Sequence, residues 1–483
     1  MNATLGSPPD TLLIGGDWQP AGDGRTFSVE DPSSGSLVAQ VADATASEAV
    51  RALDSAYQAR REWSHWAPRD RSELLRRVFK AMVDRAAELS EIMTVETGKP
   101  MEESLAEVHY AAEFFRWFSE EACRIDGRWT ASPSGNSQML VTHDPVGCCL
   151  LITPWNFPLA MPARKIAPAI AAGCTVVFKP AEATPLSAVA LTQILIDCGL
   201  PAGVLNLITT SDPGPMVSAM LKYPGLRKLS FTGSTEVGRI LTSQASSNLL
   251  RVSMELGGNA PFIVFEDADV HQAVQGAMIA KFRNAGQACT AANRFYVHEA
   301  VFDEFTGLFA DRVAEMLIGP GSEVGVNLGP LIDRSALDRV DEVVRDAKER
   351  GAQVLAGGNR IDRSGYFFEP TILLKVAEDC RVLNEEIFGP VAPVVSFSDE
   401  GEAIEAANRT QAGLVSYIYT RDLARSFRVA GSIESGMVGV NTGLVSNPAA
   451  PFGGVKWSGM GREGGHEGIS EYLETKYLAL NLG

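Results

Sequence analysis

The stretch that decides the fold spans residues 147–178 and reads GCCLLITPWNFPLAMPARKIAPAIAAGCTVVF. It contains a short apolar run at 148–152, a helix-like segment at 159–172 and a second apolar run at 175–178. Two short apolar runs joined by a helix are typical of a parallel βαβ unit, because parallel strands need a long crossover between them. The stretch therefore predicts an open α/β sheet.

The same alternation continues toward the C-terminus. Apolar runs expected to be strands recur in this region at 204–208, 228–231 and 251–255, and the helix-like stretches between them lie at 186–197, 215–221 and 235–245. This is the pattern of a nucleotide-binding sheet. A second α/β pattern begins near Gly257, with strands expected at 261–265, 294–298, 353–355, 391–397 and 438–441 and helices at 270–283, 301–316 and 335–350.

The segment before residue 126 is predicted to be helical after a short irregular start. Apolar residues recur at three- and four-residue spacing over 48–61, 70–97 and 102–124. Two candidate edge strands lie at 138–143 and within the tail 468–482. The sequence leaves open whether these strands pair across a subunit interface or lie along their own subunit.

Length and charge restrict the class of protein. A chain of 483 residues is expected to form two or three domains. The 59 acidic residues outnumber the 42 basic ones, for a net charge of −17. A surface this acidic repels phosphate backbones and anionic membranes, so we expect neither nucleic acid nor a membrane as a partner. No apolar run is long enough to span a bilayer, and the N-terminus MNATLGSPPD does not resemble a signal peptide, so the cytoplasm is the expected location.

The cysteines and histidines do not form a recognisable framework. Seven cysteines are scattered along the chain without CxxC spacing, which argues against a set of disulfides. The six histidines are dispersed as well, so no structural metal is expected.

Cys289 is the candidate nucleophile. It lies in the segment 282–291, FRNAGQACTA, which follows a predicted helix and is rich in small residues. Small neighbours let the backbone approach a ligand closely, and a cysteine there can lie at the floor of a cleft as a reactive thiolate. The alternative is a buried structural cysteine, which is the commoner role for a single cysteine.

Two further residues follow predicted strands and complete a possible catalytic set. Glu255 ends the strand at 251–255 and precedes two glycines, so it could reach into a cleft as a general base. Asn156 lies between a strand and a helix, where its amide could donate to an oxyanion. The alternatives are a salt bridge for Glu255 and a helix cap for Asn156.

The strand-to-helix turns also suit a dinucleotide. In the segment 231–238, FTGSTEVG, free backbone N–H groups at the start of a helix would suit a pyrophosphate, although the segment lacks the GxGxxG pattern. Lys179 and Glu182 follow another strand and could bind ribose hydroxyls. Taken alone, these two residues are equally well explained as a solvated ion pair.

Together these segments resemble the aldehyde dehydrogenase superfamily over essentially the whole chain. The segments 385–390, EEIFGP, and 451–456, PFGGVK, are similar to further motifs of that family. The resemblance implies a Rossmann-like cofactor domain at 1–126 and 146–256, a catalytic domain at 257–440, and oligomerisation strands at 127–145 and 465–483. It also implies a homodimer or homotetramer.

The resemblance implies a role for each motif residue. Cys289 would attack the aldehyde, Asn156 and the Cys289 N–H would hold the oxyanion, and Glu255 would activate the water that hydrolyses the thioester. The implied cofactor-binding residues are Thr153, Pro154, Trp155, Lys179, Glu182, Gly233, Ser234, Gly238, Leu256, Glu386 and Phe388. Because Glu255 supplies a base for deacylation, hydrolysis is favoured over acyl transfer to coenzyme A.

Within the superfamily, the segments 160–165, 281–286 and 441–447 resemble those of succinate-semialdehyde dehydrogenases. That resemblance implies a clamp for the distal carboxylate made of Arg164, Arg283 and Ser446, and two guanidinium groups can replace a carboxylate's hydration better than one. The alternative for each arginine is a salt bridge. Some members of the subgroup carry a second cysteine two residues after the nucleophile, but Ala291 occupies that position here, so no disulfide switch is expected.

The cofactor is expected to be NAD in preference to NADP. Some NADP-preferring members have a small residue at the position of Glu182, where a carboxylate would accept both ribose hydroxyls and repel a 2′-phosphate. Other functions stay open at this point: oxidation of glutarate semialdehyde, oxidation of a broad range of neutral aldehydes, a cysteine hydrolase without redox chemistry, or a catalytically inactive binding protein. A hydrolase would not need the cofactor segments, and an inactive protein would not need the set Cys289, Glu255 and Asn156.

Overall fold

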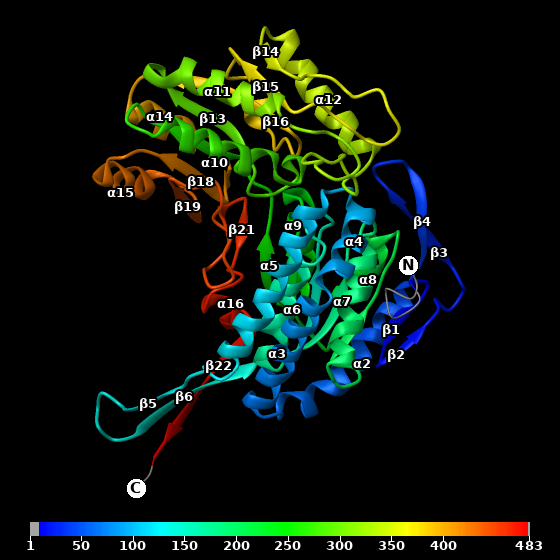
Figure 1. Ribbon diagram of the computed structural model, residues 1–483. Helices are drawn as coiled ribbons and strands as arrows, with labels where there is room; N and C mark the ends of the chain where they lie inside the picture. The colour runs from blue at the N-terminus through cyan, green and yellow to red at the C-terminus, as the bar shows by residue number, and fades with distance from the viewer. Residues whose placement is uncertain (1–8, 482–483) are drawn as a thin grey trace.

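The computed structural model describes residues 9–481. The chain forms two α/β lobes with a small three-stranded sheet projecting from one of them (Figure 1). Residues 1–8, which hold most of the stretch MNATLGSPPD, and residues 482–483, at the end of the predicted tail strand, lie outside the described residues.

The first lobe is built on the sheet that the βαβ unit predicts. Its central strands run parallel, in the pairs β9–β8, β8–β7, β7–β10 and β10–β11. The predicted α/β fold is therefore confirmed. In order across the sheet, the eight strands are β2 (Asp17–Gln19), β1 (Leu12–Ile14), β9 (Leu205–Leu207), β8 (Thr175–Lys179), β7 (Cys148–Ile152), β10 (Leu226–Thr232), β11 (Arg251–Glu255) and β21 (Gly459–Met460).

Helices cover both faces of this sheet because its central strands are apolar on both sides. Cys149 and Leu151 of β7 pack into one core and Cys148 and Leu150 into the other, as alternation along a strand requires. The first core is covered by α3 (Pro68–Asp84), α4 (Ala86–Thr97), α5 (Met101–Glu121), α6 (Ala160–Ala172) and α7 (Pro185–Asp197). The second is covered by α2 (Ala46–Ser64), α8 (Pro213–Leu221) and α9 (Thr235–Ala245).

The second lobe repeats the layered arrangement around seven strands. In order across the sheet these are β14 (Gln353–Ala356), β15 (Thr371–Leu374), β16 (Val391–Phe397), β13 (Ala292–His298), β12 (Ala260–Val264), β18 (Val415–Tyr419) and β19 (Met437–Val440). The helices of this lobe are α10 (Val270–Phe282), α11 (Phe302–Ala314), α12 (Arg334–Glu349), α13 (Arg381–Asn384), α14 (Glu400–Asn408) and α15 (Leu423–Ser432).

A three-stranded antiparallel sheet projects from the first lobe. It consists of β5 (Arg128–Ala131), β6 (Gln138–Pro145) and β22 (Leu473–Leu480), and β22 pairs with β6 along its whole length. The two predicted edge strands therefore pair with each other within one chain. Both stand away from the body of the molecule at the end marked C (Figure 1).

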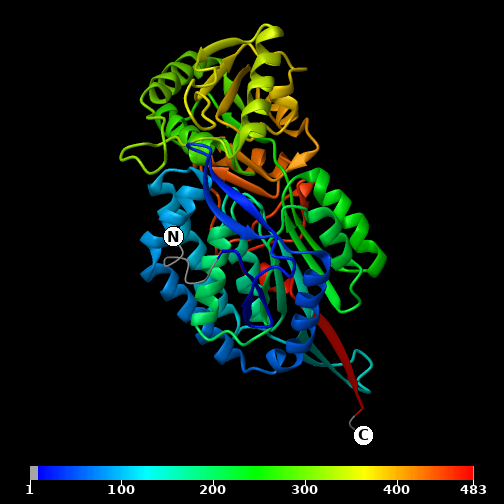
Figure 2. The ribbon, with the colours of Figure 1, turned by 90° about the vertical axis from the view of Figure 1, so that its right-hand side faces the viewer.

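The N-terminal region differs from the prediction in two ways. The expected helix at 70–97 is two helices, α3 and α4, because Arg85 between them leaves helical geometry with φ −104° and ψ 20°. The expected irregular start instead contains β1, β2 and the hairpin of β3 (Thr26–Asp31) and β4 (Ser36–Ala42). This hairpin runs along the body to the second lobe (Figure 2), where the Tyr366 N–H donates to the carbonyl of Pro32 at 3.1 Å.

The segment 441–464, which the sequence left unassigned, returns from the second lobe to the first. It forms β20 (Val455–Lys456), which pairs with β17 (Ala412–Gly413), and then β21, which pairs with β11. The short helix α16 (Glu467–Ser470) follows. Within residues 9–481, no helix is both long and apolar enough to span a membrane.

Candidate active site

The candidate site lies where the first sheet ends against the second lobe. Strands β7, β8, β10 and β11 are parallel, so the residues after them meet at one edge, where ligands bind in open α/β sheets. A cleft of about 640 Å³ opens there. Its lining includes these predicted residues: Thr153, Pro154, Trp155, Asn156, Lys179, Glu182, Gly233, Ser234, Glu255, Leu256, Cys289, Glu386 and Phe388.

Cys289 lies on a strained loop between α10 and β13. Asn284, Ala285 and Gly286 have φ values of 52°, 53° and 73°, three consecutive residues in the left-handed region. Only Gly286 adopts this conformation without a steric cost. Burial raises the pKa of the Cys289 thiol to about 12, with Arg164 lowering it and Glu386 and Glu255 raising it. The resting thiol is therefore protonated and needs a base before it can attack.

Glu255 faces the same cleft from the end of β11. Its side chain is buried, and burial, followed by the charge of Glu463, raises the pKa of its carboxyl group well above the ordinary value. Its Oε2 has no hydrogen-bond partner among the described residues. A Cβ atom at position 453 would lie 2.8 Å from Glu255 Oε1, so Gly453 leaves room for this carboxyl. A buried carboxyl with an uncommitted oxygen is suited to proton transfer.

Asn156 is held against the loop that carries the nucleophile. Its Nδ2 donates to the carbonyl of Gln287 at 3.1 Å, two residues before Cys289. Its Oδ1 is buried and has no partner within the described chain. Asn156 does not cap α6 with its side chain, so the alternative role considered from the sequence does not apply.

The cofactor side of the cleft contains donors and space for a dinucleotide. Ser234 caps α9, and its Oγ accepts from the Val237 N–H at 3.3 Å. The Oγ1 atoms of Thr153 and Thr232 are buried without a partner among the described residues, as expected where a ligand supplies one. Lys179 Nζ lies 3.4 Å from Glu182 Oε2. These features fit the nicotinamide dinucleotide that the sequence predicts.

The inner wall of this side is formed by the segment 386–388. Glu386 accepts from the Gly258 N–H at 3.1 Å, and burial raises the pKa of its carboxyl to about 7. Phe388, at φ 51°, packs edge-on against Trp155 with the ring centroids 5.4 Å apart. A residue that sequence reasoning missed, Arg339 of α12, also lines the cleft. Its position in the middle of an amphipathic helix gave no local signal.

Gly238 is absent from the cleft lining. A Cβ atom there would come within 2.4 Å of Leu256 Cδ2, so glycine is required for the close packing of α9 against Leu256. The structure therefore indicates that Gly238 shapes the site through packing.

The three predicted clamp residues come from three separate segments: Arg164 from α6, Arg283 from the end of α10, and Ser446 from the loop after β19. They converge on Tyr110 of α5, which the sequence analysis did not single out. Burial raises the pKa of the Tyr110 phenol, while the charges of both arginines and hydrogen bonds with Ser446 and Arg164 lower it. The charges of both arginines also lower the pKa of the Cys289 thiol, so the arginines lie near the nucleophile. None of the three residues lines the cleft itself, and Ser446 lines a separate pocket with Trp117 and Asn447.

Arg164 fits both interpretations considered for it. It is buried, and its Nε lies 2.5 Å from Glu463 Oε2, a salt bridge across 299 residues of sequence that no local pattern predicts. Its Nη2 has no partner in the described part of the chain. The guanidinium is therefore ion-paired with Glu463 at Nε and lies 4.0 Å from the centroid of the Phe452 ring, while Nη2 stays uncommitted. The Arg283 guanidinium lies 5.1 Å from the centroid of the Phe157 ring.

Comparison with known proteins decides the family. The model of the aldehyde dehydrogenase family matches residues 18–478. The chain belongs to this family. The prediction of an NAD(P)-dependent aldehyde dehydrogenase is therefore confirmed.

This aldehyde dehydrogenase has similar proteins with defined names. It is 52% identical to a succinate-semialdehyde dehydrogenase of Paenarthrobacter nicotinovorans over 92% of this chain and 99% of that protein. It is 48% identical to a glutarate-semialdehyde dehydrogenase of Pseudomonas putida over 97% of both chains. Among solved structures, an Escherichia coli NADP-dependent enzyme matches with a TM-score of 0.98 at 46% identity over 99% of both chains. The predicted resemblance to succinate-semialdehyde dehydrogenases is confirmed.

Over residues 9–481 there is no group of three or more histidine, cysteine, aspartate or glutamate side chains arranged to hold a metal ion.

Proposed function

We propose that this dehydrogenase oxidises succinate semialdehyde to succinate with a nicotinamide dinucleotide. The observation that carries the proposal is that Arg164, Arg283 and Ser446 all act on the Tyr110 phenol, and that the charges of both arginines also reach the Cys289 thiol. A carboxylate needs fixed guanidinium donors to replace its hydration, particularly in a protein with a net charge of −17.

The chemistry begins at Cys289. Its thiol gives its proton to solvent water in the open cleft, and the thiolate adds to the aldehyde carbon. The resulting thiohemiacetal oxyanion would be stabilised by Asn156 Nδ2 and the Cys289 N–H. A bound nicotinamide would supply the acceptor for the hydride that leaves this carbon. A thioester on Cys289 remains, and Glu255 takes a proton from the water that hydrolyses it. The raised pKa of Glu255 places this base closer to the working pH than an ordinary carboxylate.

The proposed cofactor contacts follow the lining of the cleft. Lys179 and Glu182 would bind the adenine-side ribose, Ser234 and the start of α9 the pyrophosphate, and Glu386 and Phe388 the nicotinamide ribose and ring. We propose NAD as the preferred cofactor because the Glu182 carboxylate, which is 54% exposed, would repel a 2′-phosphate. The similar Escherichia coli structure is described as NADP dependent, so position 182 is the point to test.

A second substrate is favoured by one specific comparison. The similar Pseudomonas putida protein is named for glutarate semialdehyde, which is one methylene longer than succinate semialdehyde. A pocket separates such homologues by only about 1–3 kcal/mol. The clamp would serve both substrates, and their relative kcat/KM values measure which length fits.

The test measures NADH formation with succinate semialdehyde and with an uncharged aldehyde of similar length. Arg283→Met removes a clamp cation for which no salt bridge is found within residues 9–481, so it perturbs folding less than removal of Arg164. The variant should raise KM for the charged aldehyde at least about tenfold and leave the uncharged one unchanged. Arg312→Met, an exposed arginine on α11, makes the same charge change elsewhere and serves as the control. Equal kcat/KM for both aldehydes in the unmodified protein would refute the substrate assignment.

The assembly and location are proposed as well. We propose a homodimer or homotetramer, because the projecting sheet leaves Trp129 63% and Tyr477 58% exposed and the second sheet ends in the open strand β19. The cytoplasm is supported by the chemistry of the site. All seven cysteines are free, as is common in proteins of a reducing compartment.

A further inference from the structure

Lys99 is a buried cation that the chemistry described above does not use. It lies between α4 and α5, and its side chain is 1% exposed. Its Nζ donates to Glu107 Oε2 at 2.6 Å and to the main-chain carbonyl of Asn156 at 2.8 Å, and it lies 4.5 Å from the centroid of the Phe157 ring. Burial of an ammonium group is costly unless it is paired and hydrogen-bonded, and here it is both.

The second carboxylate oxygen of Glu107 accepts hydrogen bonds from the backbone that follows Asn156. Its Oε1 accepts from the N–H groups of Leu159 at 3.0 Å and Ala160 at 3.1 Å. These groups begin α6, which has no side-chain cap of its own from its N-cap residue. Lys99 and Glu107 therefore hold both ends of the turn 156–160, one by a carbonyl and the other by two amides.

The Asn156 carbonyl has a second donor from the nucleophile loop. Asn284 Nδ2 donates to it at 2.9 Å and also to the carbonyl of Gln287 at 3.1 Å. The Asn156 carboxamide donates to that same Gln287 carbonyl. The main chain and the side chain of Asn156 are thus both linked to the segment that leads to Cys289.

The backbone around Lys99 is fixed from the second lobe. Gly98 ends α4 at φ +75°, and the Met101 N–H donates to the carbonyl of Gly321 at 3.0 Å. A Cβ atom at position 321 would lie 2.1 Å from the Lys99 carbonyl oxygen, so the two segments touch directly. The Lys99 ammonium is therefore held in place at both its backbone and its tip.

We propose that Lys99 and Glu107 are positioning residues for the oxyanion hole, which fix the Asn156 main chain so that its carboxamide stays directed at Cys289. The proposal rests on the oxyanion role proposed for Asn156. Because the Lys99 charge is neutralised by Glu107, the pair acts mainly by fixing the position of the Asn156 backbone. Its net electric field at the site is small. Catalytic geometry is sensitive to small shifts, and a displacement of about 1 Å can cost about 100-fold in rate.

The first test compares variants of the full chain in steady-state and single-turnover NADH formation. Lys99→Met should lower kcat and the single-turnover rate by about 10- to 100-fold while leaving the dissociation constant for NAD unchanged. Lys99→Arg should recover part of the loss, because a guanidinium can still donate to both Glu107 and the carbonyl. The matched control is Lys228→Met, which removes another fully buried lysine, paired with Glu471, that lies beside Cys149 at the beginning of β7, whereas the turn follows the end of that strand. This control should lower Tm and keep kcat within about twofold.

A double-mutant cycle separates positioning from general destabilisation. If Lys99 acts through Asn156, Lys99→Met should cost little in an Asn156→Ala background. The same fold-loss in both backgrounds, or a Lys99→Met rate within twofold of the unmodified enzyme, would overturn the proposal and leave the Asn156 role standing. An Asn156→Ala rate equal to that of the unmodified enzyme would overturn the oxyanion role, and the positioning role with it.

Glu107→Gln keeps the test decisive if Lys99→Met fails to fold. The amide oxygen can still accept from Leu159 and Ala160, while the ionic partner of Lys99 is lost. A loss of kcat with unchanged NAD binding, again suppressed by Asn156→Ala, supports the proposal. A purely structural role predicts a lower Tm with no change in kcat.

Discussion

At the scale of single residues, the cleft sets the protonation of its two reactive groups through burial. Burial raises the pKa of the Cys289 thiol to about 12 and that of the Glu255 carboxyl well above its ordinary value. Both groups are therefore protonated more often than free side chains would be. The charge of Arg164 opposes both shifts, so a residue of the proposed clamp also acts on the pKa of both groups.

Glu255 leads to a prediction about pH. A general base must be unprotonated, so kcat should rise as the pH rises through the elevated pKa of Glu255 and fall below it. Glu255→Gln should lower kcat by about 100-fold or more and abolish this rise, because deacylation loses its base. A burst of NADH should remain, since thioester formation does not need the deprotonated carboxylate as a water activator. Rapid-mixing measurements of the burst and of steady-state kcat across pH would check this. Loss of the burst as well would assign Glu255 to the first half-reaction.

Glu182 leads to a prediction about the cofactor. Glu182→Ser removes a carboxylate that would repel a 2′-phosphate, so the ratio of kcat/KM for NADP to that for NAD should increase at least about tenfold. Glu349→Ser, an exposed substitution at the end of α12, is the control. An unchanged ratio would show that other residues set the preference.

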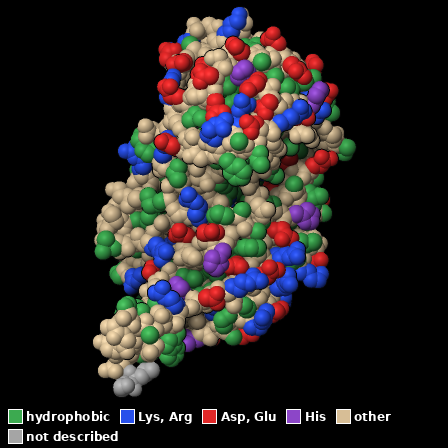
Figure 3. Space-filling model, turned by 90° about the vertical axis from the view of Figure 1, so that its left-hand side faces the viewer, with side chains coloured by type: hydrophobic (Ala, Val, Ile, Leu, Met, Phe, Trp, Pro, Cys, Tyr) green, Lys and Arg blue, Asp and Glu red, His purple; other side chains and the backbone are tan. Residues whose placement is uncertain are grey.

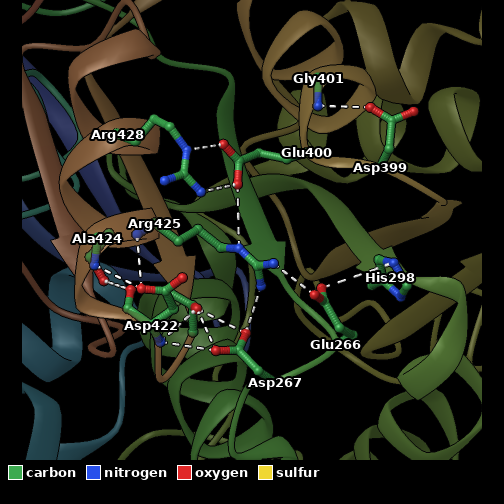
Figure 4. Close-up of polar contacts among 12 residues, drawn as sticks. Glu266, Asp267, His298, Asp399, Glu400, Gly401, Asp422, Ala424, Arg425 and Arg428 are labelled. Atoms are coloured by element: carbon green, nitrogen blue, oxygen red, sulfur yellow. Dashed lines mark hydrogen bonds and ion pairs between the residues drawn. The ribbon is translucent and has the colours of Figure 1, made fainter.

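At the scale of elements, a cluster of ion pairs connects the segments that follow the strands of the second sheet. Figure 4 shows Arg425 of α15 surrounded by acidic side chains. Its guanidinium lies 2.6 Å from Glu266, 2.8 Å from Asp267 and 3.3 Å from Glu400. Glu266 and Asp267 follow β12, while Glu400 begins α14. Ligands often bind at the carboxyl ends of parallel strands. In this lobe, the segments that follow β12 and β16 are instead joined by the ion pairs of Arg425.

This arrangement predicts a pH-dependent loss of stability. Arg425→Met leaves three acids without their shared cation, which should lower the free energy of unfolding at neutral pH by about 1–2 kcal/mol. Hydrogen bonds from Arg425 and its charge lower the pKa of Glu266, and neighbouring arginines and hydroxyls lower those of Asp267 and Glu400 despite burial. The stabilisation is therefore present above about pH 4 and is lost as the pH falls through the depressed pKa values.

Thermal unfolding at pH 7 and pH 3 checks this prediction. The difference in Tm between Arg425→Met and the unmodified protein should be large at pH 7 and small at pH 3. Arg428→Met provides the control, because Arg428 is 52% exposed and its pair with Glu400 should contribute less than about 1 kcal/mol. Equal effects of the two substitutions would contradict the central role of Arg425.

At the scale of the whole molecule, the projecting sheet is not expected to be stable without a packing partner. Two or three strands that leave the body bury little apolar surface and are marginal by themselves. Figure 3 shows this sheet standing out from the body, while acidic and basic side chains intermingle over the rest of that face. A second copy of the chain is the partner we propose for it.

Assembly can be tested with substitutions that spare the active site. Trp129→Asp combined with Tyr477→Asp places charges on the exposed aromatic positions of β5 and β22, which should shift the protein from an oligomer to a monomer. The control is Val324→Asp, which changes a fully exposed residue on the second lobe. Light scattering after size exclusion measures the mass. A monomeric unmodified protein, or an unchanged oligomer in the double variant, would exclude this sheet as the interface.

Local sequence patterns predicted the secondary structure elements and the residues at strand ends, because both depend on residues that are close along the chain. The apolar runs and helical spacing around 147–178 established the parallel sheet, and the strand-end positions of Asn156, Glu255 and Lys179 placed them at one edge. The patterns missed several short elements, including β1–β5, β15, β18, α14 and α15, because short elements have little periodicity. They also merged α3 with α4, because the break at Arg85 carries no glycine or proline.

Tertiary structure alone decided which distant side chains meet. No local pattern indicated that Glu463 pairs with Arg164, that Tyr110 lies against the proposed clamp residues, or that Lys99 donates to the carbonyl of Asn156. Residue type and spacing report local geometry and the chemistry that is available. Contacts between distant segments, and the pKa shifts that burial causes, depend on how the whole chain excludes water, which no local stretch encodes.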